Sequence, residues 1–167
     1  GDVDADFDLD LVLAGFVHVP DEDFDDGDGP PAHPQGGVDR ILLMEDGTPT
    51  QELVVEVEGG EYSFTMVAAL TDRDDDGDLD MLFGAERGDT GAPPLLFYRN
   101  DGLDAEGLPR FVNDAAELNA DISIAAMGYD AADLNGDGVL DHCMTDDRIH
   151  CLVSDGSGAY FEGGVAL

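Results

Sequence analysis

The chain has no lysine and no tryptophan, and only six arginines stand against 40 aspartates and glutamates in its 167 residues. The formal net charge of −34 excludes electrostatic attraction to nucleic acid or to an anionic membrane, because both would repel such a polypeptide. Long apolar runs are also missing. The longest, residues 11–19, contains His18 and is far shorter than the roughly 18 residues of a membrane-spanning helix. We therefore expect neither nucleic-acid binding nor membrane insertion.

A signal-peptide pattern is missing too, since residue 1 lies in an acidic stretch and no basic segment with an apolar core follows it. Any export signal would lie outside these residues. What is present is 43% apolar residues, which are enough to fill the core of one compact domain of this length. We therefore treat residues 1–167 as a single domain.

Three acidic motifs recur along the chain, at residues 1–10, 71–80 and 132–141. Each is followed by short aromatic and β-branched runs bounded by Gly, Asp, Asn and Pro, a pattern typical of strands joined by tight turns. The motifs divide the chain into repeats at 1–61, 62–118 and 119–167. The first repeat carries an acidic insertion at residues 20–37, which we interpret as a solvated surface segment. An accessory cation loop at Asp21, Asp23 and Asp25 is the alternative.

The short runs predict eleven strands and at most one helical turn, at residues 115–118. The predicted strands span 11–13, 40–44, 53–57, 64–70, 81–85, 95–98, 110–112, 122–127, 142–144, 149–153 and 160–161. Several are apolar on consecutive residues, which indicates burial of both faces, whereas short turns such as 100–102 demand antiparallel neighbours. These features predict an all-β fold of three antiparallel β-propeller blades. The first blade lacks its inner strand, so the whole is a partial propeller.

The acidic motifs are candidate metal loops, because carboxylates at alternate positions of a tight loop converge on one point. Oxygen ligands at positions one, three, five and nine, with a contribution at seven, favour Ca²⁺ over Mg²⁺ and over softer metals. The candidate ligands are Asp2, Asp4, Asp6, Asp8 and Asp10; Asp72, Asp74, Asp76, Asp78 and Asp80; and Asp133, Asn135, Asp137, Val139 and Asp141. An EF-hand or dockerin loop is excluded, because position twelve would have to be an acid and is Leu13, Phe83 or Met144.

The first loop departs from the other two at position six. Gly77 and Gly138 occupy that position in the second and third loops, whereas the first loop has Phe7 there and Ala5 nearby. A residue with a Cβ adopts the backbone geometry of such a glycine only at a cost. We therefore expect two calcium sites, in the second and third loops, and a weaker third site in the first.

The residues around the third motif resemble the FG-GAP or VCBS repeats of calcium-binding β-propellers, found in integrin alpha chains and in secreted bacterial proteins. The resemblance is carried by the stretch 125–141, by the turns 100–102 and 155–156, and by Phe111 and Phe161. It covers nearly the whole chain outside residues 20–37. It implies that each loop joins the inner strand of a blade to the second strand, and that a calcium ion ties this hairpin together.

The same resemblance implies a secreted, cell-surface or periplasmic bacterial protein that serves as an extracellular recognition, adhesion or structural module. Its implied partners are a protein or carbohydrate ligand, and further propeller blades from a longer chain or from other copies. The alternative is an accessory portion of a secreted enzyme, for example a polysaccharide-active one, whose catalytic residues lie outside this chain.

Cys143 and Cys151 flank a predicted turn at Asp147, so the sequence allows a cross-strand disulfide. With His142 and His150 beside them, a Cys2His2 zinc site is the alternative. Strand alternation argues against zinc, because it places the histidines on the face opposite the cysteines. No nucleophile elbow and no phosphate-binding glycine loop occurs, and we expect a protein without catalytic activity.

Overall fold

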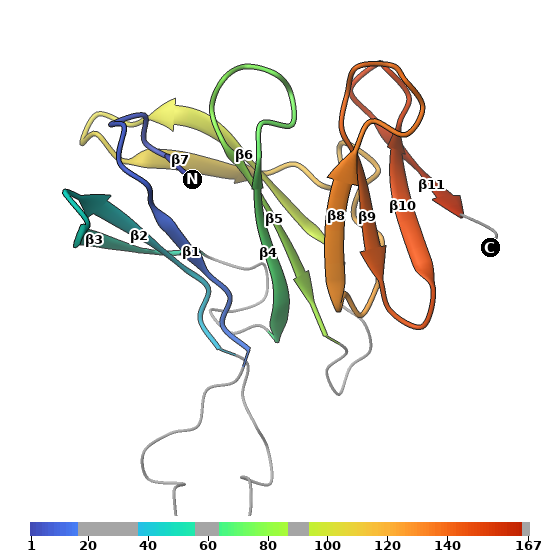
Figure 1. Ribbon diagram of the computed structural model, residues 1–167, viewed down its shortest axis with the longest axis horizontal. Coiled ribbons are helices and arrows are strands. Elements are labelled where there is room, and N and C mark those ends of the chain that lie inside the picture. The colour runs from blue at the N-terminus through green and yellow to red at the C-terminus, as the bar shows by residue number, and fades with distance from the viewer. Residues whose placement is uncertain (17–36, 56–63, 87–93, 165–167) are drawn as a thin grey trace, which may run out of the picture.

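The computed structural model describes residues 1–16, 37–55, 64–86 and 94–164, and its regular structure in these ranges is entirely β-strand (Figure 1). The strands are β1 (Leu11–Leu13), β2 (Arg40–Glu45), β3 (Thr48–Val54), β4 (Thr65–Thr71), β5 (Asp80–Ala85), β6 (Leu96–Leu103), β7 (Pro109–Asn113), β8 (Gly128–Ala132), β9 (Asp141–Thr145), β10 (Ile149–Ser154) and β11 (Tyr160–Gly164). The all-β prediction and the number of eleven strands are therefore confirmed.

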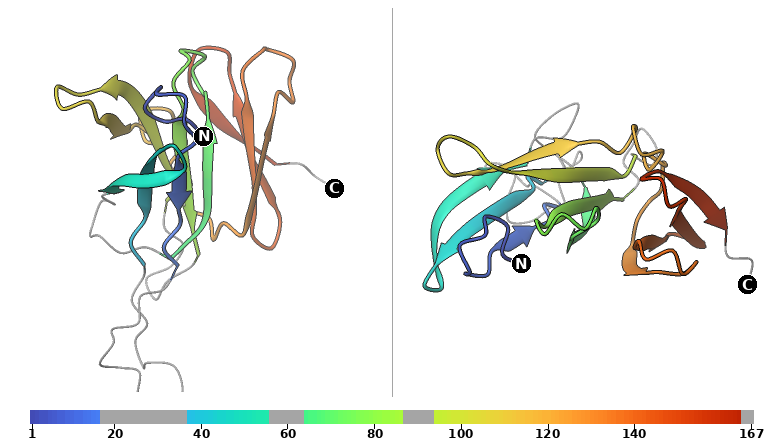
Figure 2. Two further views of the ribbon diagram at one scale, coloured as in Figure 1. Left: turned by 60° about the vertical axis from the view of Figure 1, so that its left-hand side comes forward. Right: turned by 90° about the horizontal axis from the view of Figure 1, so that it is seen from above.

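The strands form three antiparallel sheets that follow the three repeats. Sheet A has the order β1-β2-β3, sheet B the order β4-β5-β6-β7, and sheet C the order β8-β9-β10-β11. The sheets stand in a row in which β1 neighbours β4 and β4 neighbours β8, and Figure 2 shows sheets A and C at its two ends. Sheet A has one strand fewer than the others, as expected.

Two of the predicted strands lie elsewhere than expected. Residues 122–127 are not the first strand of sheet C, because β8 begins at Gly128 and pairs with β9. The segment 122–127 instead packs against sheet B: Ala126 N–H donates to the Ala85 carbonyl at 3.1 Å, and Ile124 is buried. The third strand of sheet A begins at Thr48 and ends at Val54, and residues 56–57 of its predicted range lie outside the described residues.

The turn predicted at residues 100–102 is a bulge inside β6. Gly102 N–H donates to Asn100 Oδ1 at 3.0 Å, and the register between β6 and β7 shifts at this point. The chain reverses later, where Asp104 N–H donates to the Leu108 carbonyl at 2.8 Å. By contrast, the turn predicted at 155–156 forms between strands, where Asp155 N–H donates to the Ala159 carbonyl at 3.0 Å. A two-residue turn also joins β2 to β3, with Asp46 and Gly47 both at positive φ, as such a hairpin turn requires.

Two hydrophobic clusters fill the spaces between the sheets, and β5 contributes to both. Leu82 belongs to the cluster between sheets B and C, together with Phe97 and Met144. Met81 and Phe83 belong to the cluster between sheets A and B. The consecutive apolar residues of β5 are thus buried on both faces, as the sequence pattern predicted.

The cysteines form the predicted disulfide. Cys143 of β9 and Cys151 of β10 are direct partners in the antiparallel register and are bonded to each other. His142 lies on the opposite face, and His150 Nδ1–H donates to Glu162 Oε1 at 2.7 Å. The zinc alternative is therefore wrong for these residues.

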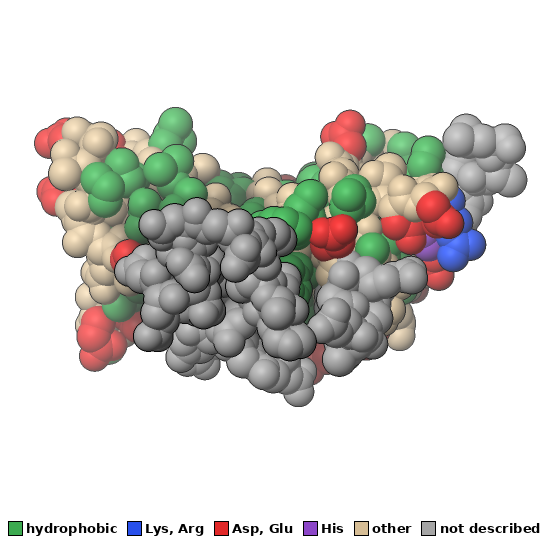
Figure 3. Space-filling view, turned by 90° about the horizontal axis from the view of Figure 1, so that it is seen from below, with side chains coloured by type: hydrophobic (Ala, Val, Ile, Leu, Met, Phe, Trp, Pro, Cys, Tyr) green, Lys and Arg blue, Asp and Glu red, His purple; other side chains and the backbone are tan. Residues whose placement is uncertain are grey.

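On the face seen in Figure 3, red acidic side chains form separate groups among tan and green atoms toward both ends, whereas blue basic atoms are seen at one end only. No helix in the described residues is long and apolar enough to cross a membrane. The acidic insertion, apart from its last residue, lies outside the described residues, as do Asp21, Asp23 and Asp25.

Candidate metal centres

The three acidic loops lie along the same edge of the row of sheets, at the top of Figure 1. The first loop, residues 2–10, leads into β1. The second, residues 72–80, joins β4 to β5, and the third, residues 133–141, joins β8 to β9. Each loop therefore leads into a strand that pairs with the next strand of the same repeat, namely β1 with β2, β5 with β6, and β9 with β10.

The second loop is closed by carboxylates that accept backbone N–H groups of the same loop. Asp72 at position one accepts from Asp76 N at 3.1 Å and from Gly77 N at 3.2 Å. Asp76 at position five accepts from Asp78 N at 2.9 Å. These bonds curl the loop so that its alternate side chains share one centre.

The other two loops repeat the same bonds. At position one, the acceptor–donor pairs are Asp2 with Asp6 and Phe7 (3.2 and 3.0 Å), and Asp133 with Asp137 and Gly138 (3.2 and 3.0 Å). At position five, they are Asp6 with Asp8 and Asp137 with Val139, both at 2.8 Å. Three segments of different sequence thus fold into one loop conformation.

The aspartate at position nine ties each loop to the rest of its sheet. Asp80 is 1% exposed; it accepts from Arg73 N inside the loop at 3.1 Å and from Asn100 N on β6 at 2.8 Å. The equivalent donors are Val3 and Met44 for Asp10 (2.8 and 2.9 Å), and Leu134 and Ser154 for Asp141 (2.7 Å each). A change in the loop is therefore transmitted to the strand that supplies the second donor, which is β2, β6 or β10.

Positive φ angles occur at positions four and six of every loop. Position four is Ala5, Asp75 or Gly136, with φ of 61°, 60° and 79°. Position six is Phe7, Gly77 or Gly138, with φ of 77°, 96° and 90°. Only the third loop has glycine at both positions, so the first loop carries the most backbone strain.

Carboxylates converge most closely in the first and second loops. One oxygen each of Asp2, Asp4 and Asp10, and one each of Asp72, Asp74 and Asp76, lie within 4.8 Å of one another. Burial and the charge of Asp10 raise the pKa of Asp4, and burial and the charge of Asp76 raise the pKa of Asp74. A cation at either centre would remove this repulsion.

The first loop holds one further sign of an unmet interaction, because the buried oxygen Oδ1 of Asp4 has no hydrogen-bond partner among the described residues. In the third loop, Asn135 takes the place of an acid, and its amide donates to Asp137 Oδ2 at 3.1 Å and to the Ser154 carbonyl at 2.8 Å. No third-loop triad of acids gathers as closely as those of the first two loops. The glycines at position six favoured the second and third loops as metal sites, whereas the carboxylates gather most closely in the first and second loops.

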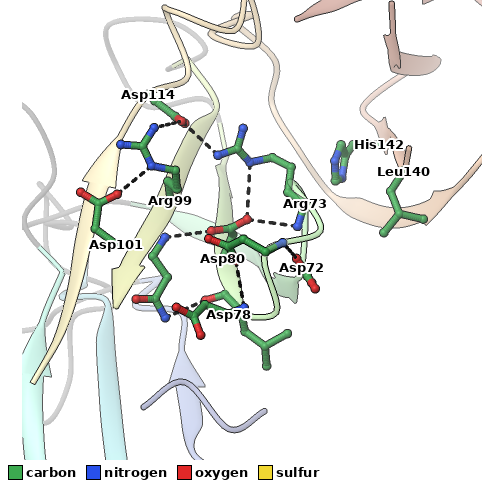
Figure 4. A network of polar contacts seen from close by, with 12 residues as sticks. Asp72, Arg73, Asp78, Asp80, Arg99, Asp101, Asp114, Leu140 and His142 are labelled. Carbon is green, nitrogen blue, oxygen red and sulfur yellow. Dashed lines mark hydrogen bonds and ion pairs between the residues drawn. The ribbon is translucent and has the colours of Figure 1, made fainter. Parts of the chain in front are cut away.

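The second loop also supplies a buried arginine that sequence reasoning missed. Arg73 points from position two into a polar network, with Nη2 at 3.0 Å from Asp114 Oδ2 and Nε at 3.7 Å from Asp80 Oδ2 (Figure 4). Arg99 reaches the same Asp114 oxygen at 3.6 Å. The sequence did hold a signal for this role, because Arg73 stands at loop position two, where the other loops have the apolar residues Val3 and Leu134.

A buried histidine lies next to the third loop. The Tyr160 hydroxyl donates to the Leu140 carbonyl at 3.4 Å, so it accepts from His142 Nε2 at 3.3 Å. Nδ1 then accepts from the Tyr129 hydroxyl at 2.8 Å. This chain of bonds requires a neutral imidazole.

His142 is expected to make the fold sensitive to acid. Burial and the charge of Arg73 lower its pKa from 6.5 to about 4. Above about pH 6.5 the imidazole is neutral in both states; between pH 6.5 and 4 only the unfolded chain takes up a proton, so stability falls by about 2 to 3 kcal/mol. A cation bound in the third loop would lower the pKa of His142 further. Urea unfolding at several pH values should show a steeper loss between pH 7 and 4.5 for the wild type than for His142→Gln, and equal slopes would contradict this role.

Phe7→Gly is expected to stabilise the first loop. The Phe7 side chain is 94% exposed and its φ is 77°, so it contributes little packing while its Cβ costs about 1 kcal/mol or more. Calcium titration should show tighter binding at one site by several-fold. The matched control is Gly138→Ala in the third loop, which introduces a Cβ at φ 90° and should weaken one site. If Phe7→Gly binds no more tightly, the loop tolerates the aromatic residue without strain.

No protein-family model, no curated protein and no solved structure matches the chain. The three loops and their surroundings are therefore the features that point to a function. Both thiols of the chain are engaged in the disulfide, so neither is available as a nucleophile or a metal ligand.

Proposed function

We propose that the chain is a calcium-binding, non-catalytic β-repeat module, in which bound ions hold the acidic loops and, through them, the sheets. The observation that supports this most directly is the threefold recurrence of one loop conformation from three different sequences. In each loop the position-one and position-five carboxylates accept backbone N–H groups of the loop. The position-nine carboxylate is buried and also accepts a backbone N–H group from another strand of its sheet, which is β2, β6 or β10.

Calcium is the cation that suits this donor set best. Every candidate side-chain ligand offers oxygen, and six to eight oxygen ligands at flexible geometry are what Ca²⁺ takes, whereas Mg²⁺ demands stricter octahedral geometry. The raised pKa values of Asp4 and Asp74 are consistent with carboxylates that lack a compensating charge. The residues at positions one, three, five and nine would hold the ion, with the backbone carbonyl at position seven.

An extracellular or periplasmic setting, in a bacterium, fits both features of the chain. The Cys143–Cys151 disulfide is favoured by an oxidising compartment, and loops of this kind bind calcium at extracellular concentrations. In this proposal the module recognises a protein or carbohydrate, or has a structural role. Its sheets are blades of a propeller that further blades complete.

Isothermal titration with CaCl₂ tests the proposal. We expect up to three sites in the wild type, and the loss of one site in each of Asp2→Asn, Asp72→Asn and Asp133→Asn. Asp104→Asn is a matched control, because Asp104 also accepts loop N–H groups, from Glu106 and Leu108 at 2.9 Å, but belongs to no acidic triad. The absence of heat in the wild type, or an equal loss in Asp104→Asn, would contradict the assignment.

A further inference from the structure

Two candidate ligands of the third loop are held by one residue, Ser154, which ends β10. Ser154 N donates to Asp141 Oδ1 at 2.7 Å, and Asn135 Nδ2 donates to the Ser154 carbonyl at 2.8 Å. Asn135 and Asp141 stand at loop positions three and nine. The backbone of a single β10 residue therefore orients two of the groups that would hold the ion.

The third loop depends on this placement more than the other two loops do. Carboxylate oxygens gather within 4.8 Å of one another in the first and second loops, but no third-loop triad of acids does so in the described residues. The position-three ligand of the third loop is the neutral amide of Asn135. Calcium affinity rises with the charge of the ligands and with the rigidity of the site. A loop with less charge therefore needs its ligands already in place.

The disulfide lies close to the point where Ser154 meets the third loop. The β9–β10 ladder runs from the turn at residues 146–148 to an open end, just beyond which Asp141 and Ser154 are bonded. The Cys143–Cys151 pair is the last but one at that open end. The open end of a hairpin is where its strands separate most easily, and a covalent bond there prevents this local opening.

Reduction of the disulfide is expected to loosen this end of sheet C while the sheet stays folded. β8 still pairs with β9, and β11 with β10, through backbone contacts that need no sulfur bond. In the reduction, a dithiol passes two electrons and two protons to the S–S bond and becomes a cyclic disulfide, leaving two thiols on the protein. Both cysteines of the chain are in sheet C, so the ties of the first and second loops to β2 and β6 should be unchanged.

We propose that the Cys143–Cys151 disulfide and calcium binding in the third loop are coupled, so that oxidation tightens this site and bound calcium protects the disulfide from reduction. This inference rests on the proposed function, since it takes calcium as the ion. The disulfide keeps Ser154 against Asn135 and Asp141, whereas in the reduced protein part of the population is open and binds less tightly. Such coupling is reciprocal: the factor by which oxidation favours calcium is the factor by which calcium favours the disulfide.

Proteins with a single intact acidic loop test the coupling. Asp2→Asn combined with Asp72→Asn leaves only the third of the three loops intact, and Asp2→Asn combined with Asp133→Asn leaves only the second, as the matched control. Each protein is titrated with CaCl₂ in its oxidised form, after reduction by a dithiol, and with Cys143→Ala and Cys151→Ala, in which no disulfide can form. Circular dichroism under each condition reports whether the sheets stay folded.

Loss of the disulfide should raise the calcium dissociation constant of the third loop by about fivefold or more, and that of the second loop by less than about twofold. In a buffer of reduced and oxidised dithiol, calcium should shift the third-loop protein toward the disulfide by the same factor as in the titration. Equal calcium affinity with and without the disulfide would overturn the coupling but leave the calcium assignment intact.

An equal loss of affinity in the second loop would also overturn the coupling, because the disulfide would then act through the stability of the whole fold. Absence of calcium binding in both single-loop proteins, even when oxidised, would instead contradict the calcium assignment and this inference with it.

Discussion

Replacing calcium by EDTA is expected to lower the thermal unfolding midpoint by about 10 °C or more. An ion that binds only the folded state stabilises it by mass action. At about 10 mM Ca²⁺ and dissociation constants of about 10⁻⁴ to 10⁻³ M, three sites contribute about 4 to 8 kcal/mol. Without the ion, the raised pKa values of Asp4 and Asp74 mean that their ionised forms, present at neutral pH, cost stability.

Differential scanning calorimetry in calcium, in magnesium and in EDTA provides the measurement. Magnesium at the same concentration should restore only part of the midpoint, because it retains its hydration waters. Since the position-nine carboxylates bond to neighbouring strands, loss of the ion should destabilise whole sheets and not only the loops. A midpoint unchanged by EDTA would remove the basis for a structural role of calcium.

Arg73→Met is expected to lower the free energy of unfolding by about 3 to 5 kcal/mol. The Arg73 side chain is 5% exposed and is the nearest cation to Asp114, which is also 5% exposed, so its removal leaves a buried carboxylate without its main partner. Arg99 lies farther from Asp114, at 3.6 Å, and offsets only part of this loss. Arg73 also lies over the Phe97 ring at 5.9 Å, a contact that methionine keeps only as packing.

A second substitution distinguishes charge from packing at this site. In the Asp114→Asn background, Arg73→Met should cost markedly less, because the buried charge has been removed. Arg110→Met is the matched surface control: Arg110 pairs with Asp101 at 2.9 Å but is 63% exposed, so its loss should cost less than about 1 kcal/mol. Urea unfolding measures all four variants. A cost for Arg73→Met that is the same with and without Asp114 would show that the ion pair is not the cause.

Most of the strands could be predicted from the sequence, because their signals are local. Runs of β-branched and aromatic residues between Gly, Asp and Asn define strands over a few residues, and the recurring motif aligns the repeats. The consecutive apolar residues Met81, Leu82 and Phe83 correctly indicated a strand buried on both faces. The alternation of His142 and Cys143 correctly favoured a disulfide over a zinc site.

Other features depend on partners far away in the chain. The apolar residues Ile124 and Ala126 look like a strand, but their burial comes from sheet B, and β8 starts only at Gly128. Asn100 to Gly102 has the composition of a turn, yet its fit against β7 makes it a bulge. Local composition cannot distinguish these cases, since the choice depends on which strand lies alongside.

For the acidic loops, the sequence by itself determined the spacing of the carboxylates, and hence which residues can face one centre. Only the tertiary structure decided the task of position nine, because the second donor to Asp80, the amide of Asn100, is 20 residues away. Likewise, only the fold shows that Arg73 is buried against Asp114, 41 residues away. Loop spacing is a property of neighbouring residues, whereas burial and hydrogen-bond partners are set by how the sheets pack, and packing joins residues that the chain keeps apart.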